Sequence, residues 1–312
     1  MKKIIILALA SLLLGGCAHS AKYHIASGDM QTIQSLDGIY LDVAPLENGP
    51  LTVEIHPEPW RYQSIANAQY QYYTPPSSPN VSPGQAAAAG AVGGLIGTLI
   101  ASKMAKDQAQ NAAQQPAQPL IDGLAGRALQ RDVREAVVDG LLSSEFAAAR
   151  SLRYGPITDE KAPRLLLQPS IKLTNGLDVL KFNINAELFA GGKQPLYRNS
   201  VEYWSAGTGY VDKQGNLAYW LAGDLEAFYG ELNLAMAHTS DYLAQSLGGT
   251  LPREDEKQAT HKIAASGGWV MLRGNVIQET DQFTVLKDLR GNIKIIRGTL
   301  MQRSSAASGS RQ

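Results

Sequence analysis

Cysteine is nearly absent from this 312-residue chain, which contains only Cys17. A single thiol cannot form a disulfide within the chain, and it cannot build a zinc site of several cysteines. An excess of charge of one sign is also missing, because 28 basic side chains balance 28 acidic ones. This balance gives no electrostatic reason to expect nucleic acid or an anionic surface as a partner.

The apolar stretch near the N-terminus is short. Lys2 and Lys3 precede residues 4–14, which are apolar except for Ser11 and are fewer than the roughly 20 residues that span a bilayer. A basic start, a brief apolar stretch and small residues are typical of a cleaved signal peptide. We predict that residues 1–16 are removed. This leaves 312 − 16 = 296 residues, with 28 − 2 = 26 basic and 28 acidic side chains.

The residues Leu14-Gly15-Gly16-Cys17 resemble the bacterial lipoprotein box. The resemblance implies that Cys17 is diacylated on sulfur, becomes the first residue and is then N-acylated. More than one acyl chain anchors a protein stably, since each buried methylene contributes about 0.8 kcal/mol. In such lipoproteins an aspartate after the cysteine retains the protein in the inner membrane, whereas this chain has Ala18. We therefore expect an outer-membrane lipoprotein with its body in the periplasm, and exposure at the cell surface stays an alternative.

Charged side chains are missing from residues 62–102. The first half of this segment is rich in tyrosine and proline, which predicts an irregular loop. The second half, residues 86–102, is almost wholly small or aliphatic. On a helix its small residues would lie along one side, because they recur at a spacing of four. They are Gly90, Gly93, Gly94, Gly97 and Ala101.

Three interpretations compete for this glycine-rich segment, which resembles the glycine zippers of bacterial envelope lipoproteins. The first is close pairing with another helix, within the chain or between subunits, because small residues let backbones approach. The second is a membrane span. A helix of 17 residues reaches about 26 Å, slightly less than the ~30 Å hydrocarbon core. The third is a mobile linker.

Hydrophobic patterning and turn residues divide the mature chain into segments. We predict a lipidated tether at 17–36, a strand pair at 37–60, and at 61–119 the uncharged loop, the glycine-rich helix and a polar linker. An α+β periplasmic domain follows at 120–249, then a charged linker at 250–264, a small β unit at 265–300 and a disordered tail at 301–312.

The α+β domain has the clearest periodicity in the chain. Leu129, Val133, Val137 and Leu141 recur at helical spacing, and apolar and polar residues alternate strictly over 180–188. Strands are also expected at 165–173 and 197–204, and a long helix from about residue 217 to 247. This order predicts an α+β fold, in which two long helices cover an antiparallel sheet. In a lipoprotein, this order resembles periplasmic domains near the curli secretion channel or those of transporter-associated auxiliary lipoproteins.

The small β unit contains Val270, Leu272, Gly274 and Val276 at alternate positions, followed by a second strand at 283–288. This pattern resembles the first strands of the bacterial OB-fold family of periplasmic proteins. The resemblance ends after Leu300, so the segment cannot supply a complete five-stranded barrel. A partial OB-like unit and a three-stranded meander are therefore both open.

Motifs for catalysis are absent from the sequence. It has no HExxH, EF-hand loop, phosphate loop or GxSxG, and Glu202, Asp224 and Glu226 lack the spacing of an acid/base pair. We expect His238 to be a surface or capping residue of the long helix. The other histidines are His19, His24, His56 and His261. We predict no enzymatic activity, no cofactor and no metal.

These observations favour a non-enzymatic outer-membrane lipoprotein, anchored to the membrane through acyl chains on Cys17. Its periplasmic body would bind a protein partner or self-associate, with the glycine-rich helix as a contact surface. An oligomeric pore-forming or secretion-associated lipoprotein, inserting several glycine-rich segments together, is the alternative. An envelope enzyme without a recognisable motif is the third hypothesis.

Overall fold

The computed structural model describes residues 27–47, 49–55, 107–156, 159, 161–252, 258–265, 268–298 and 301–302. Cys17 and the glycine-rich residues Gly90, Gly93, Gly94, Gly97 and Ala101 lie outside the described residues. The described helices are α2 (Ser27–Ser35), η1 (Gln115–Ala117), α5 (Gln118–Ala125), α6 (Leu129–Leu142), α7 (Glu145–Arg150) and α8 (Lys213–Gly248), with residues 107–114 also helical.

The strands within the described residues form one mixed sheet of eleven strands. They are β1 (Tyr40–Val43), β2 (Thr52–Val53), β3 (Arg153–Tyr154), β4 (Pro163–Leu173), β5 (Leu180–Ala190), β6 (Tyr197–Trp204), β7 (Ala259–Ala265), β8 (Gly268–Glu279), β9 (Phe283–Asp288), β10 (Ile293–Arg297) and β11 (Met301–Gln302). Their order is β11-β7-β8-β9-β10-β6-β5-β4-β1-β3, and β2 also pairs with β4.

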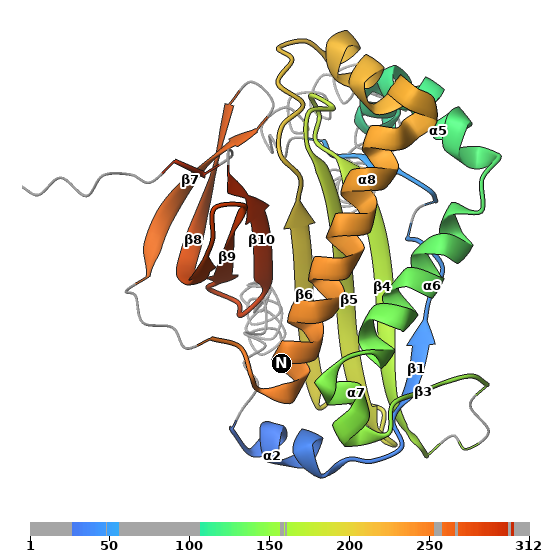
Figure 1. The fold of residues 1–312 in the computed structure, drawn as a ribbon, viewed down its shortest axis with the longest axis vertical. Coiled ribbons are helices and arrows are strands. Elements are labelled where there is room, and N and C mark those ends of the chain that lie inside the picture. The colour runs from blue at the N-terminus through green and yellow to red at the C-terminus, as the bar shows by residue number, and fades with distance from the viewer. Residues whose placement is uncertain are drawn as a thin grey trace, which may run out of the picture.

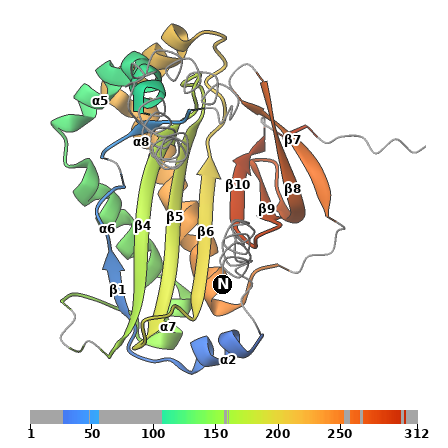
Figure 2. The same ribbon diagram turned by 180° about the vertical axis from the view of Figure 1, so that it is seen from behind.

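The centre of the sheet is the antiparallel set β4-β5-β6, in the arrangement that the sequence predicts (Figure 1). Helices α6 and α8 lie on one face of it, and the strands are seen from the opposite side in Figure 2. In β5 the buried residues Phe182, Ile184 and Ala186 alternate with partly exposed Asn183 and Asn185. The alternation predicted for residues 180–188 is thus confirmed, except that Lys181 is also buried.

A purely antiparallel sheet was the wrong expectation, because β1, β2 and β10 join it in parallel. The strand pair predicted at 37–60 does not form a hairpin. Instead β1 and β2 both pair with β4, at Arg164–Leu167 and Lys172–Leu173, so they lie one after the other along the same strand. The long β4 can accommodate both of them because it has 11 residues and they have four and two.

The two helices of the layer differ from the prediction in detail. The periodicity around Val133 and Val137 is confirmed, since both are buried on α6, but this helix is only 14 residues long. Helix α8 extends over 36 residues and is broken by non-helical backbone at residues 222–225. Gly223, Asp224 and Leu225 have positive φ there, which a helical hydrophobic pattern cannot reveal.

The residues predicted as a polar linker before the domain are ordered. Residues 107–114 are helical and lead into η1 and α5. Ala113, Ala117, Leu120 and Leu124 are buried in the main core. Gln108, Gln115 and Gln118 are exposed, whereas Gln110 donates a hydrogen bond to the carbonyl of Val53. The overall polarity of the segment therefore concealed its sparse apolar positions.

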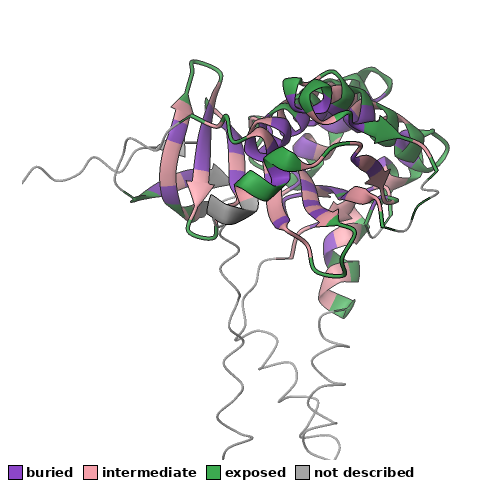
Figure 3. Cartoon of the chain, turned by 90° about the horizontal axis from the view of Figure 1, so that it is seen from below, coloured by how far each residue is buried: buried purple, intermediate pink, exposed green. Residues whose placement is uncertain are grey.

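The C-terminal strands continue the main sheet. β7, β8, β9 and β10 form an antiparallel meander, and β10 joins β6 in parallel. Buried and intermediate positions form bands along these strands in Figure 3. β7 begins at Ala259, inside the predicted linker 250–264, and β11 lies inside the predicted tail 301–312. A second core of Val179, Trp204, Ile263, Leu286 and Ile296 connects the meander to β5 and β6.

Candidate functional site

A groove lies at the edge of the sheet where β1, β3 and α6 meet. It has a volume of about 540 Å³ and is lined by Leu41, Asp42, Val43, Arg134, Tyr154, Gly155 and Pro156. We call it the edge groove. Leu41 is part of the core, whereas the side chain of Arg134 is exposed and Tyr154 is 50% exposed. The groove therefore has an apolar floor and a polar rim, as binding sites commonly have.

The pairing of β1 explains why the edge is open. β3 pairs only with Tyr40 and Leu41, so Asp42 and Val43 have no neighbouring strand on that side among the described residues. Alternate residues of a strand direct their main-chain groups to opposite sides. Ala44 donates its N–H to the carbonyl of Leu167 next to β4, and the main-chain groups of Val43 therefore face the groove.

Arginine dominates the electrostatics near this edge. Arg134 has no ion pair with any residue that the structure describes. Arg164 lies 3.9 Å from the Oδ2 of Asp42 and 5.3 Å from the centre of the Phe189 ring. At the start of β1, a hydrogen bond from Ser151 lowers the pKa of Asp37, as do the Gly38 amide and the charges of Arg153 and Arg150.

A second feature is a buried ion cluster on the sheet face opposite α8. Lys181 lies 2.7 Å from the Oε2 of Glu54 and 3.6 Å from the centre of the Trp204 ring, and Lys294 pairs with Glu202. Burial raises the pKa of Glu202, but the charges of Lys294 and Lys181 outweigh it, so the pKa is lowered overall. Each ammonium group in this cluster pairs with a carboxylate, so its charges compensate one another. The cluster also joins the end of β2 to β5, β6 and β10.

On the helix side of the sheet, His238 of α8 lies between two aromatic rings. Its ring centroid is 5.9 Å from that of Tyr203, stacked, and 4.8 Å from that of Phe283, edge-on. Burial lowers the pKa of His238, and Arg297 adds to this while Asp241 opposes it. A capping role is the wrong expectation, because α8 ends at Gly248; the half-buried ring of His238 packs α8 against β6 and β9.

The side chains around His238 bond to one another. Tyr203 donates a hydrogen bond to Glu231 at 3.2 Å, and Glu231 also pairs with Arg297. Burial, followed by the charge of Glu231, raises the pKa of Tyr203. These contacts connect β6, α8 and β10, and they leave Glu231 bonded at both carboxylate oxygens. The arrangement fits a structural role between helix and sheet.

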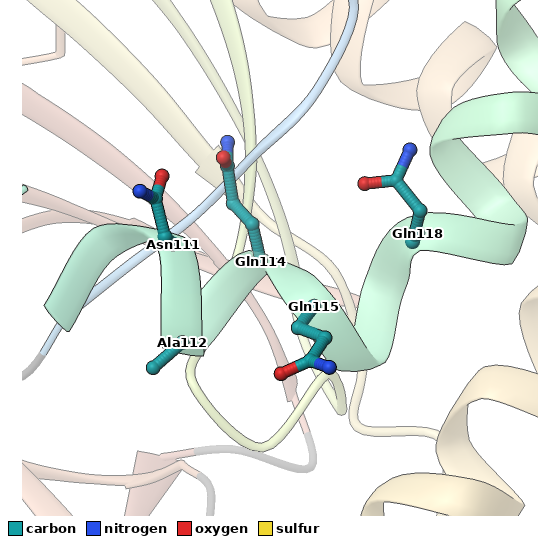
Figure 4. Close-up of a pocket in the computed structure, with 5 residues that line it drawn as sticks. All are labelled: Asn111, Ala112, Gln114, Gln115 and Gln118. Atoms are coloured by element: carbon teal, nitrogen blue, oxygen red, sulfur yellow. The ribbon is translucent and has the colours of Figure 1, made fainter. Parts of the chain in front are cut away.

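A shallow pocket of about 470 Å³ is lined by Asn111, Ala112, Gln114, Gln115 and Gln118 (Figure 4). Four of the five side chains carry amides, and those of Asn111, Gln114 and Gln118 point to the same side in the figure. All five come from one short stretch of sequence, which covers the helical residues 107–114, η1 and the first residue of α5. The described residues thus provide one wall of a site and no facing group.

Within the described parts of the chain, no group of three or more His, Cys, Asp or Glu side chains could hold a metal ion. Among the helices described there, none is both long enough and apolar enough to cross a membrane. Of the carboxylates considered for acid/base chemistry, Glu202 pairs with Lys294 and Asp224 pairs with Arg127.

The sequence did not predict the edge groove. In the sequence, Arg134 falls between the apolar positions of the predicted helix, and no pattern singles out Tyr154. Only β3 brings Tyr154 beside β1, and a two-residue strand leaves no periodic signal. Comparison with protein-family models, with curated proteins and with solved structures finds no match to this chain.

Proposed function

We propose that the protein is a non-enzymatic outer-membrane lipoprotein whose periplasmic body is a binding or assembly module of the cell envelope. The edge groove is the observation that carries this proposal. It combines an uncovered strand edge, a half-exposed tyrosine and an arginine without an ion pair among the described residues. Exposed strand edges and arginine-lined grooves both recur in peptide recognition.

The anchor of this module would be Cys17, supported by its lipoprotein-box sequence. Ten chain steps separate Cys17 from Ser27, the first residue of α2, and they reach at most about 35 Å when extended. Helix α2 lies at the same end of the body as β3 (Figure 1). The tether would hold the groove end of the body near the membrane.

Lipidation is tested by labelling cells with a palmitate analogue. The wild-type chain should be labelled and the variant Cys17→Ser should not, whereas equal labelling would refute the anchor. Outer-membrane location is tested on a sucrose gradient, where the protein should migrate with porins. The variant Ala18→Asp should move toward the inner membrane if this sorting rule operates in the host.

The binding role is tested by photocrosslinking in intact cells. A photoreactive residue replaces Tyr154 in one variant and Tyr210, an exposed residue outside the groove, in a second. A discrete adduct to an envelope protein, formed from Tyr154 and not from Tyr210, supports the proposal. A chain that yields no adduct from either position, although it is lipidated and folded, contradicts it.

Self-association through the glycine-rich residues remains part of the proposal. Leucine at Gly93 and Gly97 should break such a contact, because packed interfaces tolerate overfilling poorly. Native mass after mild detergent extraction separates the roles: a monomer or dimer fits a binding module, and a closed ring of many subunits fits the alternative pore. Crosslinking that is unchanged by both leucines would favour a linker.

The finer fold hypothesis concerns the C-terminal strands. The alternation of Val270, Leu272, Gly274 and Val276 supports a partial OB-like unit, and the antiparallel order of β8, β9 and β10 fits both this unit and a simple meander. The continuity of β10 with β6 favours a role for these strands in extending the main sheet.

A further inference from the structure

We propose that the edge groove binds an extended, acidic segment of a protein partner, which lies beside Val43 and directs a carboxylate to Arg134. This inference rests on the proposed binding function and specifies its partner. It follows from three properties of the groove: the direction of its free main-chain groups, its charge, and the position of Tyr154.

The main-chain groups favour an extended occupant. β3 ends its pairing at Leu41, and Val43 directs its N–H and C=O to the same side of β1. An extended peptide satisfies such groups by continuing the sheet. The main-chain pairing with such a peptide is short, because Pro45 is the next residue on that side of β1 and has no N–H to donate. Side chains must therefore provide most of the specificity.

The charge of the groove favours a carboxylate. Arg134 projects from α6 and has no ion pair among the residues described, whereas the one acidic lining residue, Asp42, already lies near Arg164. Arginine binds carboxylates through two parallel hydrogen bonds, and its charge persists at any physiological pH. On the same helix Arg131 is engaged by Asp132 and Glu135, so Arg134 is the cation left for a ligand at this rim.

Tyr154 supplies the apolar contact. Its ring is half exposed and lines the groove with Pro156. Tyrosine offers a large contact area with few rotatable bonds, which is why it is frequent in interfaces. Residues two apart in an extended strand lie on the same face, so a segment whose carboxylate faces Arg134 would present an aliphatic side chain two residues away to Tyr154.

The direct test uses the full mature chain in mild detergent and two fluorescent peptides. One is an acetylated octapeptide of alternating threonine and valine with a central glutamate, and the other has lysine in place of the glutamate. We expect saturable binding of the glutamate peptide in fluorescence anisotropy, at least about tenfold tighter than that of the lysine peptide. No saturable binding, or equal binding of both peptides, overturns the inference.

Charge reversal provides a sharper criterion. Arg134→Glu should weaken binding of the glutamate peptide about tenfold or more and favour the lysine peptide, and Tyr154→Ala should weaken both. The matched control Arg131→Glu makes the same charge change at another exposed position of the same helix and should leave the preference intact. Equal effects of the two reversals would show a non-specific field and refute the site. Arg134→Gln removes the charge without reversing it, and circular dichroism of this variant shows whether weakened binding reflects a folding defect.

The crosslinking described above separates this inference from the general binding function. If adducts form from Tyr210 and none forms from Tyr154, the protein binds a partner elsewhere and the groove assignment fails alone. If neither position forms an adduct, the binding function itself fails. Adducts from Tyr154 that disappear in Arg134→Glu and persist in Arg131→Glu support both.

Discussion

The ammonium nitrogen of Lys181 lies 3.6 Å from the centre of the Trp204 ring. The lysine side chain is only 8% exposed and also pairs with Glu54 at 2.7 Å. A buried ammonium is tolerated only where opposite charge and aromatic faces replace water. These contacts hold the ends of β2 and β6 against β5, so Lys181 connects segments far apart in the sequence.

The first prediction concerns this cluster. Lys181→Met should destabilise the fold by about 2 kcal/mol, because it leaves Glu54 and Glu202 with one cation fewer in a largely buried place. Lys172→Met is the control. Lys172 lies directly opposite Lys181 on β4 and is partly exposed, and its loss should cost less than about 0.5 kcal/mol. Urea unfolding measures both, and equal effects would contradict the assigned role.

The second prediction concerns the crossing of α6 and α8. A Cβ added at Gly140 would lie 2.9 Å from the Cβ of Ser240. Gly140→Ala should therefore cost about 1–3 kcal/mol by overpacking, despite its higher helix propensity. Gly230→Ala on α8 meets nothing within 4 Å and should instead stabilise by up to about 1 kcal/mol.

Thermal or urea unfolding of both variants distinguishes close packing from propensity. If Gly140→Ala stabilises as much as Gly230→Ala, the two helices do not approach as closely as described. The pair Gly140→Ala with Ser240→Gly should recover much of the loss, because the second change removes the obstructing atoms.

The sequence predicted those elements whose burial repeats with a regular period. Helix α6 and strand β5 have one apolar face each, so Val133 and Phe182 were correctly assigned to the core. The parallel additions could not be predicted in this way. Four residues of β1 show that a strand exists, but its partner is set by the long β4, which is more than a hundred residues away.

The site residues were missed for a related reason. Arg134 is an ordinary exposed helix residue in the sequence, and it becomes distinctive only because Tyr154 and Val43 lie beside it. The packing of His238 was missed, because a single histidine near a helix end gives no sign of the rings beside it. Tyr203 and Phe283, which enclose it, come from β6 and β9, on either side of α8 in the chain.

The third prediction is a pH dependence caused by His238. Burial lowers its pKa from the ordinary 6.5, so the folded state favours the neutral ring and the unfolded state binds the proton more readily. Stability from this group is present above about pH 6.5 and is lost as the pH falls below it. Arg297 opposes protonation and Asp241 favours it.

The measurement compares wild type with His238→Gln in urea unfolding between pH 8 and pH 5. The variant lacks the titrating ring, so its stability should fall less over this interval, by a difference below about 1 kcal/mol because the ring is only half buried. Identical slopes for the two proteins would show that His238 protonates as easily in the folded as in the unfolded state.

The last prediction concerns the break in α8. Gly223, Asp224 and Leu225 have φ values of 59°, 59° and 71°, a left-handed conformation that costs roughly 1–2 kcal/mol for each residue with a side chain. Contacts on both sides hold this conformation. Trp220 donates its indole N–H to the carbonyl of Leu177 at 2.6 Å, and Leu225 is buried.

Substitutions at the neighbouring positions 223 and 224 should change the free energy of unfolding in opposite directions. Asp224→Gly relieves backbone strain and gives up only an exposed ion pair with Arg127, so it should stabilise by about 0.5–1 kcal/mol. Gly223→Ala adds strain and a Cβ 3.0 Å from the Oε2 of Glu226, so it should destabilise by about 1–2 kcal/mol. In a continuous helix the order would be reversed, because alanine is favoured there over glycine. Unfolding midpoints of the two variants therefore decide between a broken and a continuous α8.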